Sequence, residues 1–318
     1  MGRRFWWMGA FLLGIYLAGV GVAGWFLLPP LLLNAPVPRR TETEREALRR
    51  SLAPPDSRWS SWEVAGGQGV PLQVWRLHRP RSLGVVIFLH GFGDDAWGSL
   101  GRAPDLADWD AVGFTFRGRD QDARIPCTLG GWERADVAAV VRALEGHGVP
   151  RSHMVLAAWS QGAGVALLAL KDLERQGGAL GGALLECPFE DLHEAARNHV
   201  RLLLGAWEPF ARPAEWLGLW KAGRMAGFDP VAVSPREAGQ GLRTPVALVT
   251  GDADIETPVQ GVQAIARSHP DLTVVAGAGH CQASGRLPGG WGAWATERLR
   301  RWGLQPPVSP ARPAPALP

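Results

Sequence analysis

Residues 158–162, Ala-Trp-Ser-Gln-Gly, place a single serine, Ser160, among small residues where two apolar segments meet. The segment before it is typical of a buried strand, and the segment after it has the apolar spacing of a helix. A serine on so sharp a strand-to-helix turn projects its hydroxyl away from the sheet, where it can act as a nucleophile. The usual pattern has glycine two residues before and two after the serine, because the two backbones nearly touch there. Gly162 fits this pattern, and Ala158 is a small replacement for the first glycine.

Acidic residues and a histidine that could assist such a serine follow other predicted strands. Residues 251–258, Gly-Asp-Ala-Asp-Ile-Glu-Thr-Pro, contain Asp252 and Asp254, and Glu186 ends a further apolar run. Residues 277–280, Gly-Ala-Gly-His, place His280 on a flexible loop. A serine nucleophile needs a base that accepts its proton and a carboxylate that orients the base. These residues alone leave three candidates for the carboxylate.

A glycine-rich turn upstream of the serine supplies backbone amides. His90-Gly91-Phe92-Gly93 follows an apolar run, and its glycines allow the backbone to bend so that an amide points inward. We predict that the amides of Phe92 and Gln161 form an oxyanion hole, which stabilises the charge that develops on an attacked carbonyl. His90 itself is predicted to hold this loop rather than to act as a base.

The apolar pattern predicts elements that bring these loops together. Alternating runs at 59–65 and 70–78 indicate an antiparallel hairpin, and the continuous apolar run at 84–89 is typical of a buried central strand. Further strands are predicted at residues 111–116, 153–158, 181–186, 245–251 and 272–276, and helices at residues 132–146, 161–176, 258–269 and 289–302. This alternation predicts an α/β fold: a mostly parallel central sheet, helices on both faces, and chemistry at the carboxyl ends of the strands.

We expect one catalytic domain at residues 57–304, interrupted by a long insertion. Residues 189–242 contain no clear strand and carry several tryptophans and leucines among arginines and prolines. An insertion of this length is expected to be a helical cap over the site, and the alternative is an extra helical layer that fills the core. The proline-rich tail at 305–318 is predicted to be disordered.

The amino terminus is strongly apolar. Residues 5–28 include no charged side chain, and as a helix they would be roughly 36 Å long, enough to cross a bilayer. Trp6 and Trp7 near one end and Trp25 near the other occupy the positions of an aromatic belt. We predict that residues 1–35 form an uncleaved single-pass membrane anchor, with a cleaved signal sequence and a buried core helix as alternatives.

The charges on either side of this segment predict its orientation. Arg3 and Arg4 favour a cytoplasmic amino terminus, whereas the arginines within residues 39–50 favour the opposite orientation. Because this second group follows a proline-rich stretch, we expect the catalytic part on the extracytoplasmic side. Residues 36–56 alternate acids and arginines and are predicted to be a linker or a short solvated helix.

The overall composition excludes some classes of function. The chain has 318 residues and a formal net charge of +3, and its arginines are spread among acids rather than gathered in a basic block. We therefore expect no nucleic-acid partner. Its three cysteines are too few and too scattered to predict a disulfide framework or a zinc site.

Together the motifs resemble those of serine hydrolases of the α/β-hydrolase fold, over roughly residues 59–302. Within that family the sequence is similar to the carboxylesterase and serine-aminopeptidase-like branch. The resemblance rests on three stretches besides the serine turn: Thr-Leu-Gly-Gly-Trp-Glu-Arg-Ala-Asp-Val at 128–137, Arg117-Gly118, and Phe228-Asp229-Pro230 with Ser234-Pro235. It departs from the family at Ala158 and at Thr115, where many relatives have aspartate before the Arg-Gly pair.

The resemblance implies roles for individual residues. Ser160, Asp254 and His280 follow the family's chain order of nucleophile, acid and base. It therefore favours Asp254 over Asp252 and Glu186 as the acid. It also implies that no metal ion or cofactor is needed.

We accordingly expect a serine hydrolase that cleaves an ester or thioester through an acyl-enzyme. The apolar insertion and the membrane anchor favour a small-molecule or lipid-like substrate with an apolar acyl group. A serine peptidase or aminopeptidase of the same fold is the alternative. A membrane-anchored binding domain without catalysis would be expected to lack one of the three residues, and all three are present.

Overall fold

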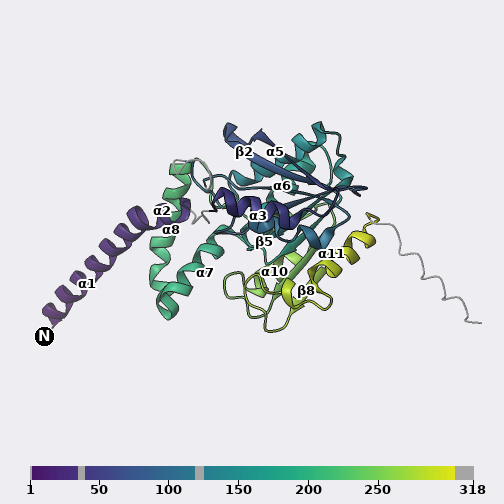
Figure 1. Ribbon diagram of the computed structural model, residues 1–318. Coiled ribbons are helices and arrows are strands. Elements are labelled where there is room, and N and C mark those ends of the chain that lie inside the picture. Colours follow the sequence, from purple (N-terminus) through teal and green to yellow (C-terminus); the bar gives the residue numbers. More distant parts are fainter. Residues whose placement is uncertain (1, 35–39, 119–124, 305–318) are drawn as a thin grey trace, which may run out of the picture.

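The computed structural model describes residues 2–34, 40–118 and 125–304 (Figure 1). These residues form an eight-stranded sheet in the order β1-β2-β4-β3-β5-β6-β7-β8. The strands are β1 Arg58–Ala65, β2 Pro71–His78, β3 Val85–Leu89, β4 Asp110–Phe114, β5 Met154–Trp159, β6 Gly182–Glu186, β7 Val246–Gly251 and β8 Asp271–Val275. β2 is antiparallel to β1 and β4, and all other neighbours are parallel. The predicted α/β class, with its hairpin and mostly parallel sheet, is confirmed.

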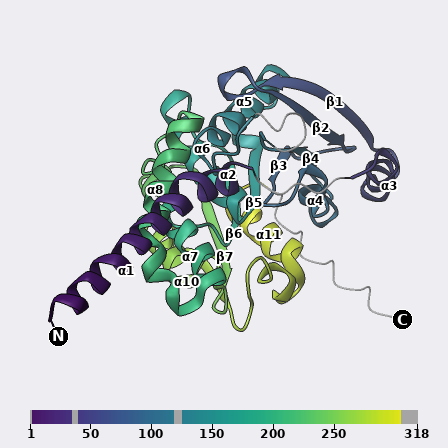
Figure 2. The same ribbon diagram turned by 90° about the vertical axis from the view of Figure 1, so that its left-hand side faces the viewer.

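Helices cover both faces of this sheet (Figure 2). Side chains alternate along the central strand, so that Ile87 packs in one apolar cluster and Phe88 in the other. The first cluster includes residues of α5 Glu133–Gly146, α6 Gln161–Gln176 and α10 Val259–Ala266. The second includes residues of α3 Glu42–Leu52, α4 Ala96–Leu100 and α11 Gly290–Arg301. Burial on both faces explains the continuous apolar runs of the central strands.

The helix α3 lies within the segment that we predicted as a linker or solvated helix. Its first turn has a capping box, in which the Thr41 hydroxyl accepts from the Glu44 amide and the Glu44 carboxylate accepts from the Thr41 amide. Its last residue, Leu52, is buried in the second cluster. The predicted linker thus includes a helix that packs against the domain. Residues 35–39, and the tail at 305–318 that we predicted to be disordered, lie outside the described residues.

The predicted insertion is helical. α7 Leu192–Leu204, α8 Glu208–Ala226 and α9 Pro235–Gly239 lie between β6 and β7. The Asp191 and Ser234 side chains accept hydrogen bonds from the third residues of α7 and α9, which fixes where these helices begin. α7 and α8 form a hairpin that projects beside the amino-terminal helix (Figure 1). Side chains of α7 and α8 line the same cavity as Ser160, and the role of the insertion as a cap stays a prediction.

The amino-terminal segment is helical from Gly2 to Leu33: α1 Gly2–Val22, a π-helical turn Ala23–Leu27, and α2 Leu28–Leu33. Among the described residues it is the one helix long and apolar enough to cross a membrane, over residues 6–33 with mean hydropathy 2.1. Only 6% of its apolar window is buried, which argues against a soluble core helix. Its last part does pack on the domain, because a Cβ on Gly24 would lie 2.7 Å from the Ala214 carbonyl oxygen of α8.

Candidate active site

Ser160 occupies the turn between β5 and α6. Its φ of 53° lies in the left-handed region, which is strained for a residue with a side chain and is found at sharp functional turns. A Cβ on Gly162 would lie 2.5 Å from the Leu89 carbonyl oxygen, so only glycine fits where α6 crosses the end of β3. Ala158 is buried in the first cluster and pairs with Leu89 across the sheet. Alanine therefore fits where the sequence departs from the usual glycine.

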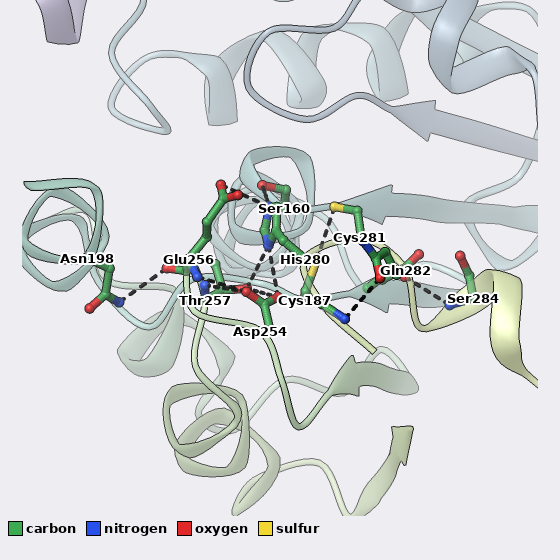
Figure 3. Close-up of polar contacts among 12 residues, drawn as sticks. Ser160, Cys187, Asn198, Asp254, Glu256, Thr257, His280, Cys281, Gln282 and Ser284 are labelled. Carbon is green, nitrogen blue, oxygen red and sulfur yellow. Dashed lines mark hydrogen bonds and ion pairs between the residues drawn. The ribbon is translucent and has the colours of Figure 1, made fainter. Parts of the chain in front are cut away.

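Three side chains form a continuous chain of hydrogen bonds (Figure 3). The Ser160 Oγ lies 2.8 Å from His280 Nε2, and His280 Nδ1 lies 2.9 Å from Asp254 Oδ2. An ionised carboxylate only accepts, so we assign the ring proton to Nδ1, which leaves Nε2 to accept from the serine hydroxyl. This is the geometry in which a histidine can take the serine proton.

Asp254 is held in place by the loop that carries it. Its Oδ1 accepts from the amides of Glu256 and Thr257, each at 2.9 Å, and its Oδ2 accepts from the Thr257 hydroxyl at 2.8 Å. Burial by itself would raise the pKa of Asp254, but the hydrogen bond from His280 and those from Thr257 outweigh it and lower the pKa. Burial likewise opposes the charged ring of His280, yet the bond to Asp254 raises the pKa of His280 above its ordinary value.

The other two candidate acids have different contacts. Asp252 is exposed, and its Oδ1 accepts from the Gly277 amide at 2.6 Å, which ties the loop after β7 to the loop after β8. Glu186, at the end of β6, accepts from the Ser284 amide at 2.9 Å and lies 3.4 Å from the Arg102 guanidinium. Because β6 lies between β5 and β7, Glu186 anchors the loop of His280 where it crosses toward the serine.

The predicted oxyanion residues flank the serine. A Cβ on Gly91 would lie 3.4 Å from the Ser160 Cβ, so the loop after β3 runs directly beside Ser160. His90 fixes this loop: its Nε2 accepts from the Phe116 amide, and its Nδ1 therefore carries a proton and donates to the Gly91 carbonyl at 2.8 Å. Phe92 and Gln161 both line the same cavity as Ser160. Their roles as amide donors stay predictions.

The cavity has a volume of about 910 Å³, and its wall is mostly apolar. Its lining includes Ser160, His280 and Trp159, together with side chains of α7. The amino-terminal segment forms part of the wall through Leu28, Leu31, Leu32 and Asn34. Sequence reasoning did not assign these residues to the site, because a leucine that faces a substrate cavity has the same pattern as one that faces lipid.

These contacts place the candidate site at the carboxyl ends of β3, β5, β7 and β8, below the inserted helices. No family model matches the chain, and no curated protein matches it. Among solved structures, an esterase of Pyrococcus furiosus aligns with 85% of this chain and 98% of its own, with a TM-score of 0.62 and 19% identity. An esterase of the bacterial hormone-sensitive lipase family aligns with 83% of this chain and 93% of its own, with a TM-score of 0.55 and 22% identity.

The chain has the α/β-hydrolase fold. A puromycin hydrolase aligns as well, over 70% of this chain and 36% of its own, with a TM-score of 0.51 and 16% identity. In the α/β-hydrolase fold the site lies where the structure brings Ser160 and His280 together, at the carboxyl edge of the sheet. Similarity at this level of identity establishes the fold alone.

Two further features of the site escaped sequence reasoning. The Glu215 side chain of α8 lines the cavity and is buried, both of its oxygens lack a hydrogen-bond partner among the described residues, and burial raises its pKa to about 7. The Cys187 and Cys281 sulfurs lie 3.3 Å apart beside His280, and the ligand atoms of these three residues fall within 4.8 Å of one another. Burial raises the pKa of the Cys187 thiol, so a thiophilic metal would have to displace its proton.

Proposed function

We propose that the protein is a serine hydrolase that transfers an acyl group to water. The observation that carries this proposal is the chain of hydrogen bonds from Ser160 through His280 to Asp254, at 2.8 and 2.9 Å. The strained turn at Ser160 and the adjoining apolar cavity support it. Such a constellation is recognised by geometry and roles rather than by sequence position.

In the proposed reaction His280 Nε2 takes the hydroxyl proton as Ser160 Oγ attacks the substrate carbonyl. Asp254 remains ionised, since its pKa is lowered, and stabilises the imidazolium that forms. The amides of Phe92 and Gln161 would hold the oxyanion. His280 then returns the proton to the leaving group, which departs and leaves an acyl-enzyme. Water, activated by the same histidine, attacks the acyl-enzyme and releases the acid.

We propose an ester or thioester with an apolar acyl group as the substrate. The cavity wall includes Leu28, Leu31, Leu32, Leu192 and Leu203, and such walls favour alkyl chains over polar peptides. A peptidase would act through the same three residues, so the two activities differ in the substrate and not in the nucleophile.

We also propose that the amino-terminal helix is an uncleaved anchor and that the catalytic part lies on the extracytoplasmic side. The Leu33 carbonyl accepts from the Cys127 amide at 2.9 Å, and Leu33 is buried. Cleavage after the apolar segment would remove this contact and part of the cavity wall. Arg3 and Arg4 before the span support a cytoplasmic amino terminus.

Labelling with a fluorophosphonate probe tests the nucleophile. The full-length chain in detergent is expected to react, and Ser160→Ala is expected to abolish the reaction. Ser60→Ala is a matched control, because Ser60 also contacts a histidine that lies near an aspartate. The Ser60 Oγ lies 2.7 Å from His78 Nε2, and the His78 Nδ1 lies 3.6 Å from Asp110. Ser60 lies within the regular strand β1 rather than on a sharp turn, so its replacement should leave the labelling unchanged. Equal labelling of wild type and Ser160→Ala would overturn the proposal.

A second measurement separates the two hydrolase activities. The purified chain is assayed with p-nitrophenyl esters of increasing acyl length and with aminoacyl p-nitroanilides. Higher kcat/KM for the longer esters is the expected result, because a longer chain fills more of the apolar wall. A preference for the aminoacyl anilides would instead identify a peptidase.

A further inference from the structure

The hairpin of α7 and α8 ends in an exposed apolar tip, which we call the hairpin tip, residues 202–210. Its exposed side chains are Leu202, Leu203, Leu204, Trp207 and Phe210. Single exposed apolar residues are common, but a cluster of five large ones on one projecting turn marks an interaction surface.

The hairpin projects on the same side of the domain as the amino-terminal helix (Figures 1 and 2), and α8 contacts that helix. The Tyr16 hydroxyl donates to the Phe210 carbonyl at 2.9 Å. Farther along, a Cβ on Gly218 would lie 2.7 Å from the Leu28 Cβ. Both helices therefore run in the same direction and converge toward the π-helical turn, and the Tyr16 side chain reaches the start of α8 from the middle of the apolar helix.

An aromatic and cationic belt marks the other end of this contact. The Lys221 ammonium donates to the Trp25 carbonyl at 2.6 Å and lies 4.3 Å from the Trp25 ring centroid. The centroids of the Trp220 and Trp25 rings lie 6.1 Å apart. The Arg224 guanidinium lies 5.5 Å from the centroid of the Trp220 ring. Tryptophans together with cationic side chains are typical of the boundary between lipid headgroups and acyl chains.

The belt sets the depth of the hairpin tip. Tyr16 precedes Trp25 by nine residues, roughly 14 Å along a helix, which is within one leaflet of a bilayer. The charges near the tip are paired: Glu208 is buried and binds Arg212 at 2.9 Å and Arg201 at 3.7 Å.

The same cavity that holds Ser160 reaches this surface. Leu31 and Leu203 both line it, and they are 66% and 79% exposed, one on the amino-terminal segment and one on the hairpin tip. The apolar wall thus continues from the serine to side chains that face outward beside the span. This wall would guide an acyl chain from the hairpin tip toward Ser160.

We propose that the hairpin tip inserts into the leaflet next to the amino-terminal helix, and that the substrate is a membrane lipid whose ester-linked acyl chain enters the cavity sideways from that leaflet. The second half of this inference rests on the proposed hydrolase function. The first half rests on the exposed side chains of the hairpin tip and on the contacts of the amino-terminal helix with α8.

Lipid quenching tests the insertion. The full-length chain carrying Trp207→Cys is labelled with an environment-sensitive dye and reconstituted in vesicles of phosphatidylcholine and phosphatidylglycerol that contain doxyl-labelled lipid. Quenching by the doxyl lipid and protection from aqueous iodide are expected. The same label at Val231→Cys, another exposed apolar position, should show the reverse.

Two results would overturn the insertion. One is iodide quenching of the label at position 207 equal to that at position 231. The other is protection from both quenchers, which would mean that a second copy of the chain covers the hairpin tip.

Activity tests the route of entry. The double variant carries Leu202→Ser and Trp207→Ser, at two side chains that do not line the cavity. It should hydrolyse a long-chain ester embedded in the vesicles about tenfold more slowly or worse, because the tip loses apolar area that would be buried in lipid. Hydrolysis of soluble p-nitrophenyl butyrate should stay unchanged. Equal rates on the embedded ester would overturn the route. A wild type that hydrolyses neither ester would overturn the hydrolase function, while the quenching result would stand by itself.

Discussion

His280 Nδ1 lies 2.9 Å from Asp254 Oδ2, although the two residues are 26 positions apart and follow different strands. The contact exists because β7 and β8 are parallel neighbours, so that the loops after them meet at one edge. Backbone bonds from Asp252 to Val275 and from Ala253 to Ala278 join the two loops. The acid and the ring are therefore aligned before any substrate binds.

This contact predicts the pH dependence. His280 acts as a base only when it is neutral, and Asp254 raises its pKa, so kcat/KM for a soluble ester should rise with pH, with a midpoint above the ordinary value of about 6.5. Asp254→Asn removes the charge that holds the proton, so the midpoint should move to lower pH while kcat falls by up to about 10⁴-fold. Asp252→Asn is the control and should leave the midpoint in place. An unchanged midpoint in Asp254→Asn would contradict the assignment.

The second prediction concerns the close approach at Gly162. A methyl group there would meet the backbone oxygens of Leu89 and His90 at 2.5 and 2.6 Å, and neither can move without disturbing β3. Gly162→Ala should lower the free energy of unfolding by about 1–3 kcal/mol and also reduce probe labelling of Ser160. Gly146→Ala at the end of α5 meets nothing within 4 Å and should instead stabilise by about 0.4–1 kcal/mol. Chemical denaturation measures the free energy of unfolding of both variants. An equal change in Gly162→Ala and Gly146→Ala would contradict the packing argument.

A third prediction concerns a buried ion pair. Arg117 binds Asp136 through two hydrogen bonds of 2.8 and 2.6 Å, and both side chains are almost fully buried. Asp136→Asn leaves the guanidinium without a charged partner and should cost about 3–5 kcal/mol of unfolding free energy. Asp172→Asn breaks the half-buried, more solvent-accessible pair with Arg134 and should cost less than about 1 kcal/mol. Thermal denaturation of both variants measures the loss of stability. Similar losses in Asp136→Asn and Asp172→Asn would show that burial does not determine how much each ion pair contributes.

The fourth prediction separates the anchor from the cavity wall. Removal of residues 1–22 leaves Gly24, Leu28 and Leu33 in contact with the domain, so the shortened chain should still hydrolyse a soluble short ester at a rate near that of the full chain. Removal of residues 1–34 strips the wall and exposes the apolar side of α8, so activity and solubility should fall sharply. Full activity of the chain that lacks residues 1–34 would contradict a role of the amino-terminal segment in the cavity wall.

Much of the candidate site could be predicted from the sequence because its signals are local. The turn at Ser160 requires small neighbours, and the helix expected at 161–176 is found as α6 Gln161–Gln176. Continuous apolar runs likewise identified the central strands, because a strand that is buried on both faces is apolar throughout. These patterns depend on the residue and its immediate neighbours.

Long-range placement was decided by the tertiary structure. Asp252 and Asp254 stand two residues apart in one loop, and their spacing did not separate them: the family resemblance favoured Asp254, and the structure places its carboxylate against His280. Glu186 had the same strand-end position, yet it binds the loop of His280 instead. Spacing along the chain carries no information about which neighbouring loop a carboxylate will meet.

The amino-terminal helix shows the same division most clearly. Its composition determined that it is long and apolar enough to cross a bilayer, since hydropathy sums over single residues. That Leu28, Leu31 and Leu32 line the cavity of Ser160 was decided only by packing against α8. An apolar side chain is stabilised equally well by lipid, by protein or by an acyl chain, so its identity alone does not tell which of the three it meets.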